Sequence, residues 1–487
     1  MFRRTFLLRA FSLIPGFIFP NALFALPKDA SDKVIKNSGL SEFTSAQVYD
    51  LEAERVLYAH NPLKALPIAS VVKALTASYA LETIGATYRF STEIYSDGAI
   101  DNGIIKGNLY LVGGADPTLN TDDLAELVKK LKEKGLKEVK GRFIFDSNIL
   151  PDVHFIDETQ LPQESYNPGF SGLNLNGNRI LFQWQKSKNK LSLNLNARGQ
   201  KNGASAKNIS INASDKLANI YNYSLDTKGG LERWLISKSF LKKNGGRWLP
   251  VRLSADYTGH VFRDLCAQKG IILKSGEKGI CVKSKSRLLA IHKSASLSSI
   301  IKNMLKKSTN VTAEIIGMFV PRFWGIKVNS LSDSGAIMAR WLKNSSPIER
   351  VLLNNHSGLS IETRISAFDF IKFLRRPESI QNLSKLMKQY PIYGSDKESY
   401  KMSDVEIFAK TGTMHFNRGL AGYICCEGVP KAAFAIFSAD LSRKEAVKKY
   451  EQANPKGSKN WLRRAKAQER FLVESWSKYY VENRIIS

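Results

Sequence analysis

The chain has 487 residues, 43% of them hydrophobic, so it can bury a large core, and we expect two or three domains. It carries 72 Lys and Arg against 44 Asp and Glu, a formal net charge of +28. Such an excess is common among nucleic-acid-binding proteins, but the first residues of the chain argue against that class, and we predict no nucleic-acid partner.

Residues 1–25 have the pattern of an export signal. Three arginines among the first nine residues precede an uncharged stretch from Ala10 to Pro27, which contains the small residues Ala22 and Ala25 near its end. Two prolines and the short apolar run disfavour a transmembrane helix. The general secretory route is favoured over the twin-arginine route that the paired arginines also allow. We predict a cleaved signal, a periplasmic location and a mature chain of charge +25, which suits contact with an anionic envelope.

The predicted elements change in character along the chain. Residues 43–61 alternate like two strands joined by an acidic turn, and a helix follows Pro67. From about 96 to 260, short alternating runs are separated by Gly, Asn and Asp turns and interrupted by one helical stretch at 122–135. After that come helices at 297–310, 332–344 and 366–376, strands at 405–413, 418–426 and 431–441, and a helix over 461–480.

The helix over 461–480 has an apolar stripe, formed by Trp461, Ala465, Leu472, Trp476 and Tyr479. Its opposite face is basic, as in helices that lie on a membrane surface. Packing of the stripe on the neighbouring sheet is the favoured interpretation.

Four cysteines allow two interpretations. A bridge between Cys266 and Cys281 is one, and four small buried apolar side chains is the other. Cys425 and Cys426 are neighbours on a predicted strand and point to opposite faces. No Cys or His cluster has the spacing of metal ligands, so we predict no metal and no cofactor.

Ser70 and Lys73 are a candidate nucleophile and base. They stand one helical turn apart at the start of the predicted helix after Pro67. A serine hydroxyl needs a base to take its proton, and a lysine serves only if burial or another cation depresses its pKa. Because the chain contains six Ser-x-x-Lys pairs, the spacing alone does not identify the site.

Two further motifs single out the pair at Ser70. Lys410-Thr411-Gly412 occurs once, on a predicted strand, and supplies a second cation. Gly412 lets a substrate backbone come close, and the hydroxyls of Thr411 and Thr413 can bind a carboxylate. The third motif, Ser308-Thr309-Asn310, offers a hydroxyl and an amide after a helix.

This order of motifs is the set of the penicillin-recognising serine enzymes. From about Ser41 to the C-terminus the chain resembles the D-alanyl-D-alanine carboxypeptidases and endopeptidases of the low-molecular-mass class C penicillin-binding proteins. "GNLYLVGGADPTL", "NHSGLS" at 355–360 and "LAGYI" at 420–424 contribute to the resemblance. The 234 residues between Lys73 and Ser308 agree with the domains inserted there in that class.

The resemblance implies an α/β (α+β) fold, a serine β-lactamase/transpeptidase-like catalytic domain with a β-rich insertion. The catalytic domain then comprises 26–95 and 261–487, and the insertion 96–260. Ser70 would attack the penultimate D-alanine, Lys73 would act as base, Ser308 would relay a proton and Asn310 would orient Lys73. Lys410, Thr411 and Thr413 would hold the terminal carboxylate beside Gly412, and the N–H groups of Ser70 and Thr413 would form the oxyanion hole.

Two departures from the family pattern concern substrate recognition. Asn355-His356 stand where many relatives have Asp-Gly, and Ile361 stands where an arginine that helps bind a carboxylate is common. We expect a local structural role for His356. In the family, the insertion also supplies an acidic residue for the diamino side chain of the substrate, with Asp146, Asp152 and Asp157 as candidates here.

We predict a penicillin-sensitive D-Ala-D-Ala carboxypeptidase/endopeptidase acting on peptidoglycan stem peptides. A β-lactamase is the nearest alternative, but it needs a group that activates the deacylating water, and none stands out. An exported basic wall-binding protein without catalysis is the alternative from another class. Intact Lys73, Asn310 and Lys410 argue against it.

Overall fold

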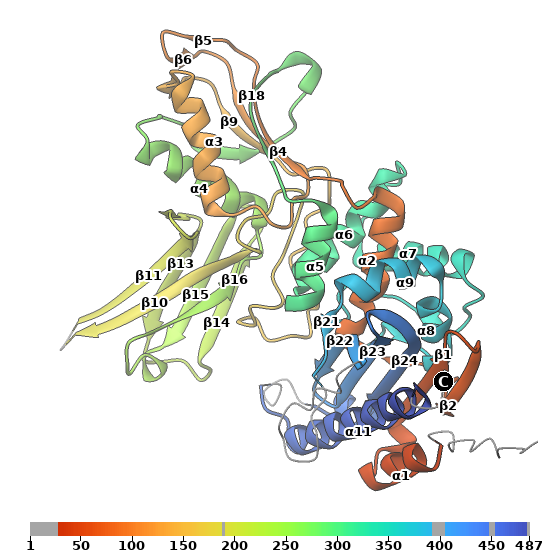
Figure 1. The fold of residues 1–487 in the computed structure, drawn as a ribbon. Helices are drawn as coiled ribbons and strands as arrows, with labels where there is room; N and C mark the ends of the chain where they lie inside the picture. The colour runs from red at the N-terminus through yellow and green to blue at the C-terminus, as the bar shows by residue number, and fades with distance from the viewer. Residues whose placement is uncertain (1–27, 188–189, 392–404, 448–452, 485–487) are drawn as a thin grey trace, which may run out of the picture.

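The computed structural model describes residues 28–187, 190–391, 405–447 and 453–484, and the predicted export signal lies outside these residues. Its largest sheet joins the two ends of the chain (Figure 1). The six strands, in spatial order and antiparallel throughout, are β2 (Arg55–His60), β1 (Thr44–Asp50), β24 (Val429–Ala439), β23 (Asn417–Cys426), β22 (Val405–Met414) and β21 (Lys388–Gln389).

Helices cover both faces of this sheet, which explains why β1 and β23 are buried along their whole length. One face forms the main core with α2 (Lys73–Ile84), α5 (Leu297–Lys307), α6 (Asn310–Phe323), α7 (Leu331–Ser345), α8 (Ala367–Leu374) and α9 (Pro377–Leu386). α11 (Ser458–Arg484) crosses the other face, with α1 (Lys28–Ser38) beside it (Figure 1).

The apolar stripe of α11 packs on the sheet, as favoured from the sequence. Trp461, Ala465, Leu472 and Trp476 are at most 2% exposed. Tyr58 and Phe434 of the sheet contact the ring of Trp476. Among the described residues, no helix is long and apolar enough to cross a membrane.

A second core lies in the middle of the chain, at the upper left of Figure 1. A five-stranded sheet there consists of β17 (Gly276–Lys278), β9 (Phe143–Asp146), β7 (Leu109–Gly113), β4 (Ser91–Ser96) and β18 (Arg287–Lys293), with α3 (Thr121–Glu133) and α4 (Ser254–Gln268) packed on it. Two smaller sheets share the same core: β12 (Gly203–Ala204), β11 (Lys190–Arg198), β10 (Arg179–Ser187) and β16 (Gly245–Pro250); and β13 (Ile209–Ser214), β15 (Leu231–Ser237) and β14 (Tyr221–Asp226).

The five-stranded sheet extends past the expected bounds of the insertion, 96 and 260. β4 begins at Ser91, before residue 96, and pairs with β18, and α4 continues past residue 260 to Gln268. Because β-pairing between distant segments leaves no turn signal at the point of insertion, the sequence pattern does not show this boundary. We propose that the inserted region comprises residues 91–293.

All four cysteines lie among the described residues, where they are buried and form no disulfide, so Cys266 and Cys281 are not bridged. Cys266 lies in the inserted core and Cys425 in the main core. The cysteines thus serve as small apolar side chains, the second of the two interpretations from the sequence.

Candidate active site

Ser70 stands at a tight turn between the main sheet and its first covering helix. The short strand β3 (Leu66–Pro67) leads into a 3-10 turn at Ala69–Val72, and α2 begins at Lys73. Ala69 has a left-handed backbone (φ +46), which turns the chain sharply just before Ser70. Ser70 Oγ lies 2.8 Å from Lys73 Nζ. In the part of the chain that the structure describes, no other Ser-x-x-Lys pair is joined by a side-chain hydrogen bond.

The surroundings of Lys73 favour a neutral amine. The side chain is fully buried, and burial together with the nearby charge of Lys410 holds the pKa of Lys73 well below its usual range. Besides Ser70, Nζ contacts Asn310 Oδ1 at 2.8 Å and the Ser357 carbonyl oxygen at 2.6 Å. Both of these oxygens can only accept hydrogen bonds, so each accepts one from the two N–H groups of a neutral amine. Its lone pair then faces the Ser70 hydroxyl.

The inserted region fixes the orientation of the Asn310 amide. Asn310 Nδ2 donates to the backbone carbonyl of Tyr166 at 3.0 Å. Because a carbonyl only accepts, Nδ2 must face Tyr166 and Oδ1 must face Lys73. Sequence patterns do not predict this contact, since a backbone carbonyl has no side-chain signature.

Lys410 and Ser308 form a second lysine–serine pair beside the first. Lys410 Nζ donates to Ser308 Oγ at 3.0 Å and to the Thr411 carbonyl at 2.6 Å. Ser308 follows α5 in a left-handed conformation (φ +57), directly before α6 begins at Asn310. Burial, assisted by the charge of Arg418, lowers the pKa of Lys410 to about 7. The motif residues predicted from the sequence therefore meet in one place.

β22 passes so close to the Ser70 turn that only glycine fits at position 412. A Cβ there would lie 2.6 Å from the Ile68 carbonyl oxygen and 2.8 Å from the Ser70 nitrogen. Thr413 is exposed and Thr411 is half-buried. β21 pairs with β22 only as far as Ala409, so within the described ranges no strand covers the edge beyond it.

Glu314 is a site residue that the motifs do not reveal. It lies one helical turn after Asn310 on α6 and is fully buried. Its two carboxylate oxygens accept the N–H groups of His356 and Ser357, each at 2.9 Å. This fixes the segment whose carbonyl contacts Lys73. A search for acidic residues four positions after Asn310 would have found Glu314.

His356 has the structural role expected of it. Its side chain is fully buried, and Nε2 lies 2.8 Å from the Ser334 hydroxyl. Burial lowers the pKa of His356 to about 3, so the ring stays neutral. A Cβ on Gly317 would collide with this ring, which shows how tightly α6 packs on it.

The three candidate acids of the inserted region have different surroundings. Asp146 accepts from Asn148 and from the N–H of Cys281, and Asp152 pairs with Lys278 at 3.1 Å. Asp157 instead belongs to the loop that carries Tyr166, and its carboxylate acts electrostatically on Lys444 of α10 (Leu441–Glu445). Lys444 in turn contacts Met414 at the end of β22. Of the three candidates, Asp157 is thus the one linked to the active site, through the Tyr166 loop and through Lys444.

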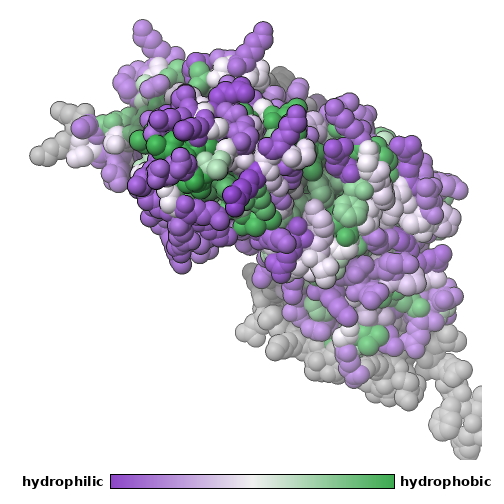
Figure 2. All heavy atoms as spheres, turned by 90° about the horizontal axis from the view of Figure 1, so that it is seen from above, coloured by the Kyte–Doolittle hydropathy of each residue, from purple (hydrophilic) through white to green (hydrophobic). Residues whose placement is uncertain are grey.

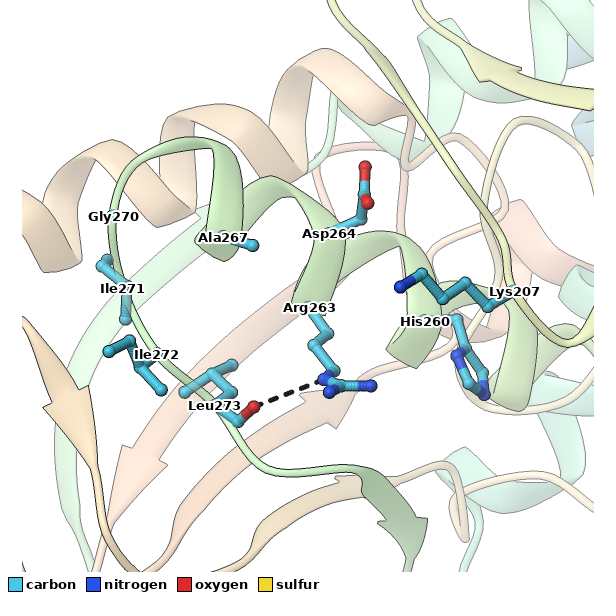
Figure 3. Close-up of a pocket in the computed structure, with 9 residues that line it drawn as sticks. All are labelled: Lys207, His260, Arg263, Asp264, Ala267, Gly270, Ile271, Ile272 and Leu273. Carbon is cyan, nitrogen blue, oxygen red and sulfur yellow. Dashed lines mark hydrogen bonds between the residues drawn. The ribbon is translucent and has the colours of Figure 1, made fainter.

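A separate hollow of about 250 Å³ lies against α4 in the inserted region (Figure 3). Charged and apolar residues line it, and Arg263 donates to the Leu273 carbonyl at 3.3 Å. Its lining contains no serine or cysteine. Among the described residues, no group of His, Cys, Asp and Glu is arranged to hold a metal ion.

Fold and site together define a serine hydrolase of the penicillin-recognising class. The chain belongs to the D-Ala-D-Ala carboxypeptidase 3 (S13) family, whose model matches residues 28–456. It is therefore a serine peptidase that acts on peptidoglycan, as predicted.

The relatives agree with this family over most of the chain. A D-alanyl-D-alanine carboxypeptidase from Actinomadura sp. (strain R39) is 23% identical, over 81% of this chain and 77% of its own length. The D-alanyl-D-alanine carboxypeptidase DacB of Haemophilus influenzae is 22% identical, over 92% and 95%. The crystal structure of penicillin-binding protein 4 (dacB) from H. influenzae matches with a TM-score of 0.71 at 18% identity, covering 92% of this chain and 99% of that one. The predicted fold, with its insertion, is confirmed.

Proposed function

We propose that this protein is a D-Ala-D-Ala carboxypeptidase and endopeptidase that forms its acyl-enzyme on Ser70. The observation that carries the proposal is the orientation of Lys73. Two acceptors, Asn310 Oδ1 and the Ser357 carbonyl, leave the lone pair of a neutral Lys73 facing the Ser70 hydroxyl. A buried amine with a lowered pKa is the base that a serine nucleophile requires.

The reaction then proceeds in two steps. Ser70 Oγ attacks the carbonyl carbon of the penultimate D-alanine while Lys73 takes its proton. The N–H groups of Ser70 and Thr413 stabilise the oxyanion, a contribution of about 3 kcal/mol per donor. When the C–N bond breaks, the proton that Lys73 took from Ser70 is relayed through the Ser308 hydroxyl to the leaving nitrogen, so that Lys73 is neutral again and Ser308 keeps its proton; Ser308 is held by its contact with Lys410. In the second step neutral Lys73 takes a proton from water, the hydroxide attacks the ester carbonyl, and the same proton returns to Ser70 Oγ as the C–O bond breaks.

A labelling experiment tests the nucleophile. A fluorescent penicillin should modify the mature protein at Ser70, identified by mapping the labelled peptide, and Ser70→Ala should abolish labelling without loss of fold. Ser299, which begins another Ser-x-x-Lys pair, provides the matched control: Ser299→Ala should label as the parent does. Label on any serine other than Ser70 would overturn the assignment.

A peptide assay tests the reaction. The protein should release alanine from a peptide that ends in D-Ala-D-Ala and leave the L-Ala-L-Ala analogue essentially intact. Inverting the terminal carbon misplaces the scissile carbonyl, and small misplacements cost large factors in rate. Labelling of Ser70 without cleavage of either peptide would favour a wall-binding protein without catalysis.

We further propose Asp157 as the residue that recognises the diamino side chain of the stem peptide. Its support is the loop that it shares with Tyr166, whose carbonyl contacts Asn310. Asp157→Asn should raise KM for a peptide with a free side-chain amine and leave KM for the acetylated peptide unchanged. Asp152→Asn, which removes a partner of Lys278, is the matched control. An equal change for both peptides would contradict the proposal.

Export to the periplasm and contact with the anionic envelope complete the proposed function. The support is the composition of residues 1–25 and the charge of +25 after their removal. N-terminal sequencing of the protein recovered from the periplasm tests the cleavage; an intact N-terminus at Met1 would contradict it.

A further inference from the structure

Arg418 lies on the buried side of Thr413, one of the residues expected to bind the terminal carboxylate of the substrate. It pairs with Thr413 across β23 and β22, and its Nη1 donates to Thr413 Oγ1 at 2.5 Å. Nε donates to Glu469 of α11 at 2.7 Å. The Arg418 side chain is only 8% exposed. An arginine from the neighbouring strand therefore reaches the hydroxyl of the Lys-Thr-Gly-Thr segment from within the protein.

The hydrogen bond from Arg418 determines what Thr413 can do. A hydroxyl has one proton and two lone pairs, and an arginine only donates. Since Thr413 Oγ1 accepts from Nη1, its own proton points away from the guanidinium. Thr413 is exposed, so this proton is available to an acceptor on a bound substrate, and a carboxylate is the acceptor that a neighbouring cation favours.

The geometry of the Arg418–Glu469 pair argues against a purely structural role. A guanidinium and a carboxylate bind most strongly through two parallel hydrogen bonds. Here Glu469 accepts a hydrogen bond only from Arg418 Nε, through Oε2. Its other carboxylate oxygen, Oε1, is buried and has no hydrogen-bond partner among the described residues. The second arm of the guanidinium is directed to Thr413 instead.

The charge of Arg418 also matters because Lys410 is incompletely charged. With a pKa of about 7, Lys410 loses its charge as the pH rises through neutrality. Arginine keeps its charge at any working pH.

We propose that Arg418 is the specificity-determining residue for the free C-terminal carboxylate of the substrate, acting through Thr413 and held in place by Glu469. The inference rests on the proposed peptidase reaction at Ser70, and it names the residue that selects the substrate of that reaction. A peptide with a free terminal carboxylate is preferred over the same peptide with a neutral terminus. The reason is that Arg418 supplies a permanent positive charge next to the Thr413 hydroxyl that binds the carboxylate.

The test compares two substrates of the full mature chain: a peptide ending in D-Ala-D-Ala and its C-terminal carboxamide, with released D-alanine or D-alaninamide quantified. Arg418→Gln should lower the preference for the carboxylate, as a ratio of kcat/KM values, by about 10- to 100-fold, mostly through KM. Arg142→Gln, which removes an exposed arginine paired with Glu277 in the inserted region, is the matched control and should keep the preference.

A second variant keeps the test decisive if Arg418→Gln does not fold. Arg418→Lys retains the charge beside Glu469, but a lysine has no fork that reaches Glu469 and Thr413 together. It should lose about threefold to tenfold of the carboxylate preference. The pH profile gives an independent readout: without the charge of Arg418, Lys410 keeps its proton to higher pH, so the rise of KM with pH should move upward in Arg418→Gln.

The outcomes separate this inference from the proposed function. Equal losses for both substrates, with the preference and the pH profile unchanged, would assign Arg418 a structural role and overturn the inference. A parent protein that cleaves D-Ala-D-Ala peptides but shows no carboxylate preference would overturn it as well. Failure of the parent to cleave peptides or to react with penicillin at Ser70 would instead overturn the proposed function.

Discussion

Two buried lysines in one site have different hydrogen-bond partners. Lys73 contacts three oxygens, of which one belongs to the proposed nucleophile. Lys410 contacts the Ser308 hydroxyl and a carbonyl of its own strand, and it lies beside Arg418. A base must lose its proton at working pH, whereas a partner of a carboxylate must keep one. The sequence predicts the pair, and the hydrogen bonds support a different role for each.

Substituting arginine at each lysine should separate the two roles. Lys73→Arg should slow acylation by penicillin by about 10²- to 10⁴-fold, because a guanidinium does not act as a base at neutral pH. Lys410→Arg keeps the cation and should cost much less. Stopped-flow labelling of both variants measures this. Similar losses in the two variants would contradict the division of roles.

The pKa of Lys410 predicts how peptide cleavage depends on pH. Burial disfavours the charged form of a lysine, so the pKa of Lys410 falls to about 7 and its positive charge is lost as the pH rises through that value. Binding of the terminal carboxylate should therefore weaken above pH 7, seen as a rising KM. In Lys410→Arg this alkaline rise should disappear, since arginine stays charged. A rise that persists in the variant would assign the titration to another group.

At the scale of elements, the site depends on how closely two chain segments pack against the Ser70 turn. β22 approaches it at Gly412, and the segment at 355–358 approaches it at Gly358, which has a left-handed backbone (φ +78). A Cβ on either glycine would meet backbone atoms of the turn. Backbone cannot move aside as a flexible side chain can, so these glycines set the position of Ser70.

Gly412→Ala should therefore damage acylation more than stability. The added Cβ would push β22 away from the Ser70 nitrogen, and a shift of a few tenths of an ångström disturbs the oxyanion hole. We expect at least about a tenfold loss in the rate of penicillin labelling, by analogy with the loss of one oxyanion donor. Gly246→Ala, whose Cβ would meet nothing nearer than 3.3 Å, is the control. Unchanged labelling in Gly412→Ala would show that the turn adapts.

The elements also show where sequence patterns succeed. The strands at 405–414 and 417–426 and the helix at 121–133 match the predicted segments, because alternation and helical spacing are local properties. The bounds of the inserted region and the Tyr166 contact depend on segments that meet only in the fold. The Arg418–Thr413 pair is local, since both residues flank one tight hairpin, but alternation alone does not show that their side chains bond to each other.

Removing the inserted region tests the bounds proposed for it. Phe90 and Ser294 are hydrogen-bonded neighbours: Phe90 N–H donates to Ser294 Oγ at 3.0 Å, and Ser294 N–H donates to the Phe90 carbonyl at 2.9 Å. A short Gly-Ser linker in place of 91–293 should leave a folded domain that penicillin still labels, more slowly because the Tyr166 contact is lost. Removing 96–260 alone would cut α4 and leave β18 without its sheet, so that chain should unfold at lower temperature or aggregate. Equal behaviour of the two deletions would contradict these bounds.

At the scale of the whole molecule, the chain carries a formal net charge of +28, and the face seen in Figure 2 is largely hydrophilic. Lys73 and Lys410 are buried and take no part in that surface. Long-range attraction to a polyanionic wall and chemistry at Ser70 should therefore respond differently to salt, because salt screens exposed charges far more than buried ones.

Raising the salt concentration should weaken action on intact cell wall and spare action on a small peptide. Between about 0.05 and 0.5 M salt the Debye length falls from roughly 14 to 4 Å, so attraction between separated charges is largely lost. We expect binding to purified wall sacculi to fall at least about tenfold, while cleavage of a soluble D-Ala-D-Ala peptide changes less than about threefold. Glutamate at the exposed lysines Lys201, Lys216, Lys228 and Lys242 of the inserted region should reproduce the loss at low salt. If peptide cleavage fell in parallel with sacculus binding, the surface charge would act on the chemistry itself. The proposed distinction between attraction to the wall and reaction at Ser70 would then be wrong.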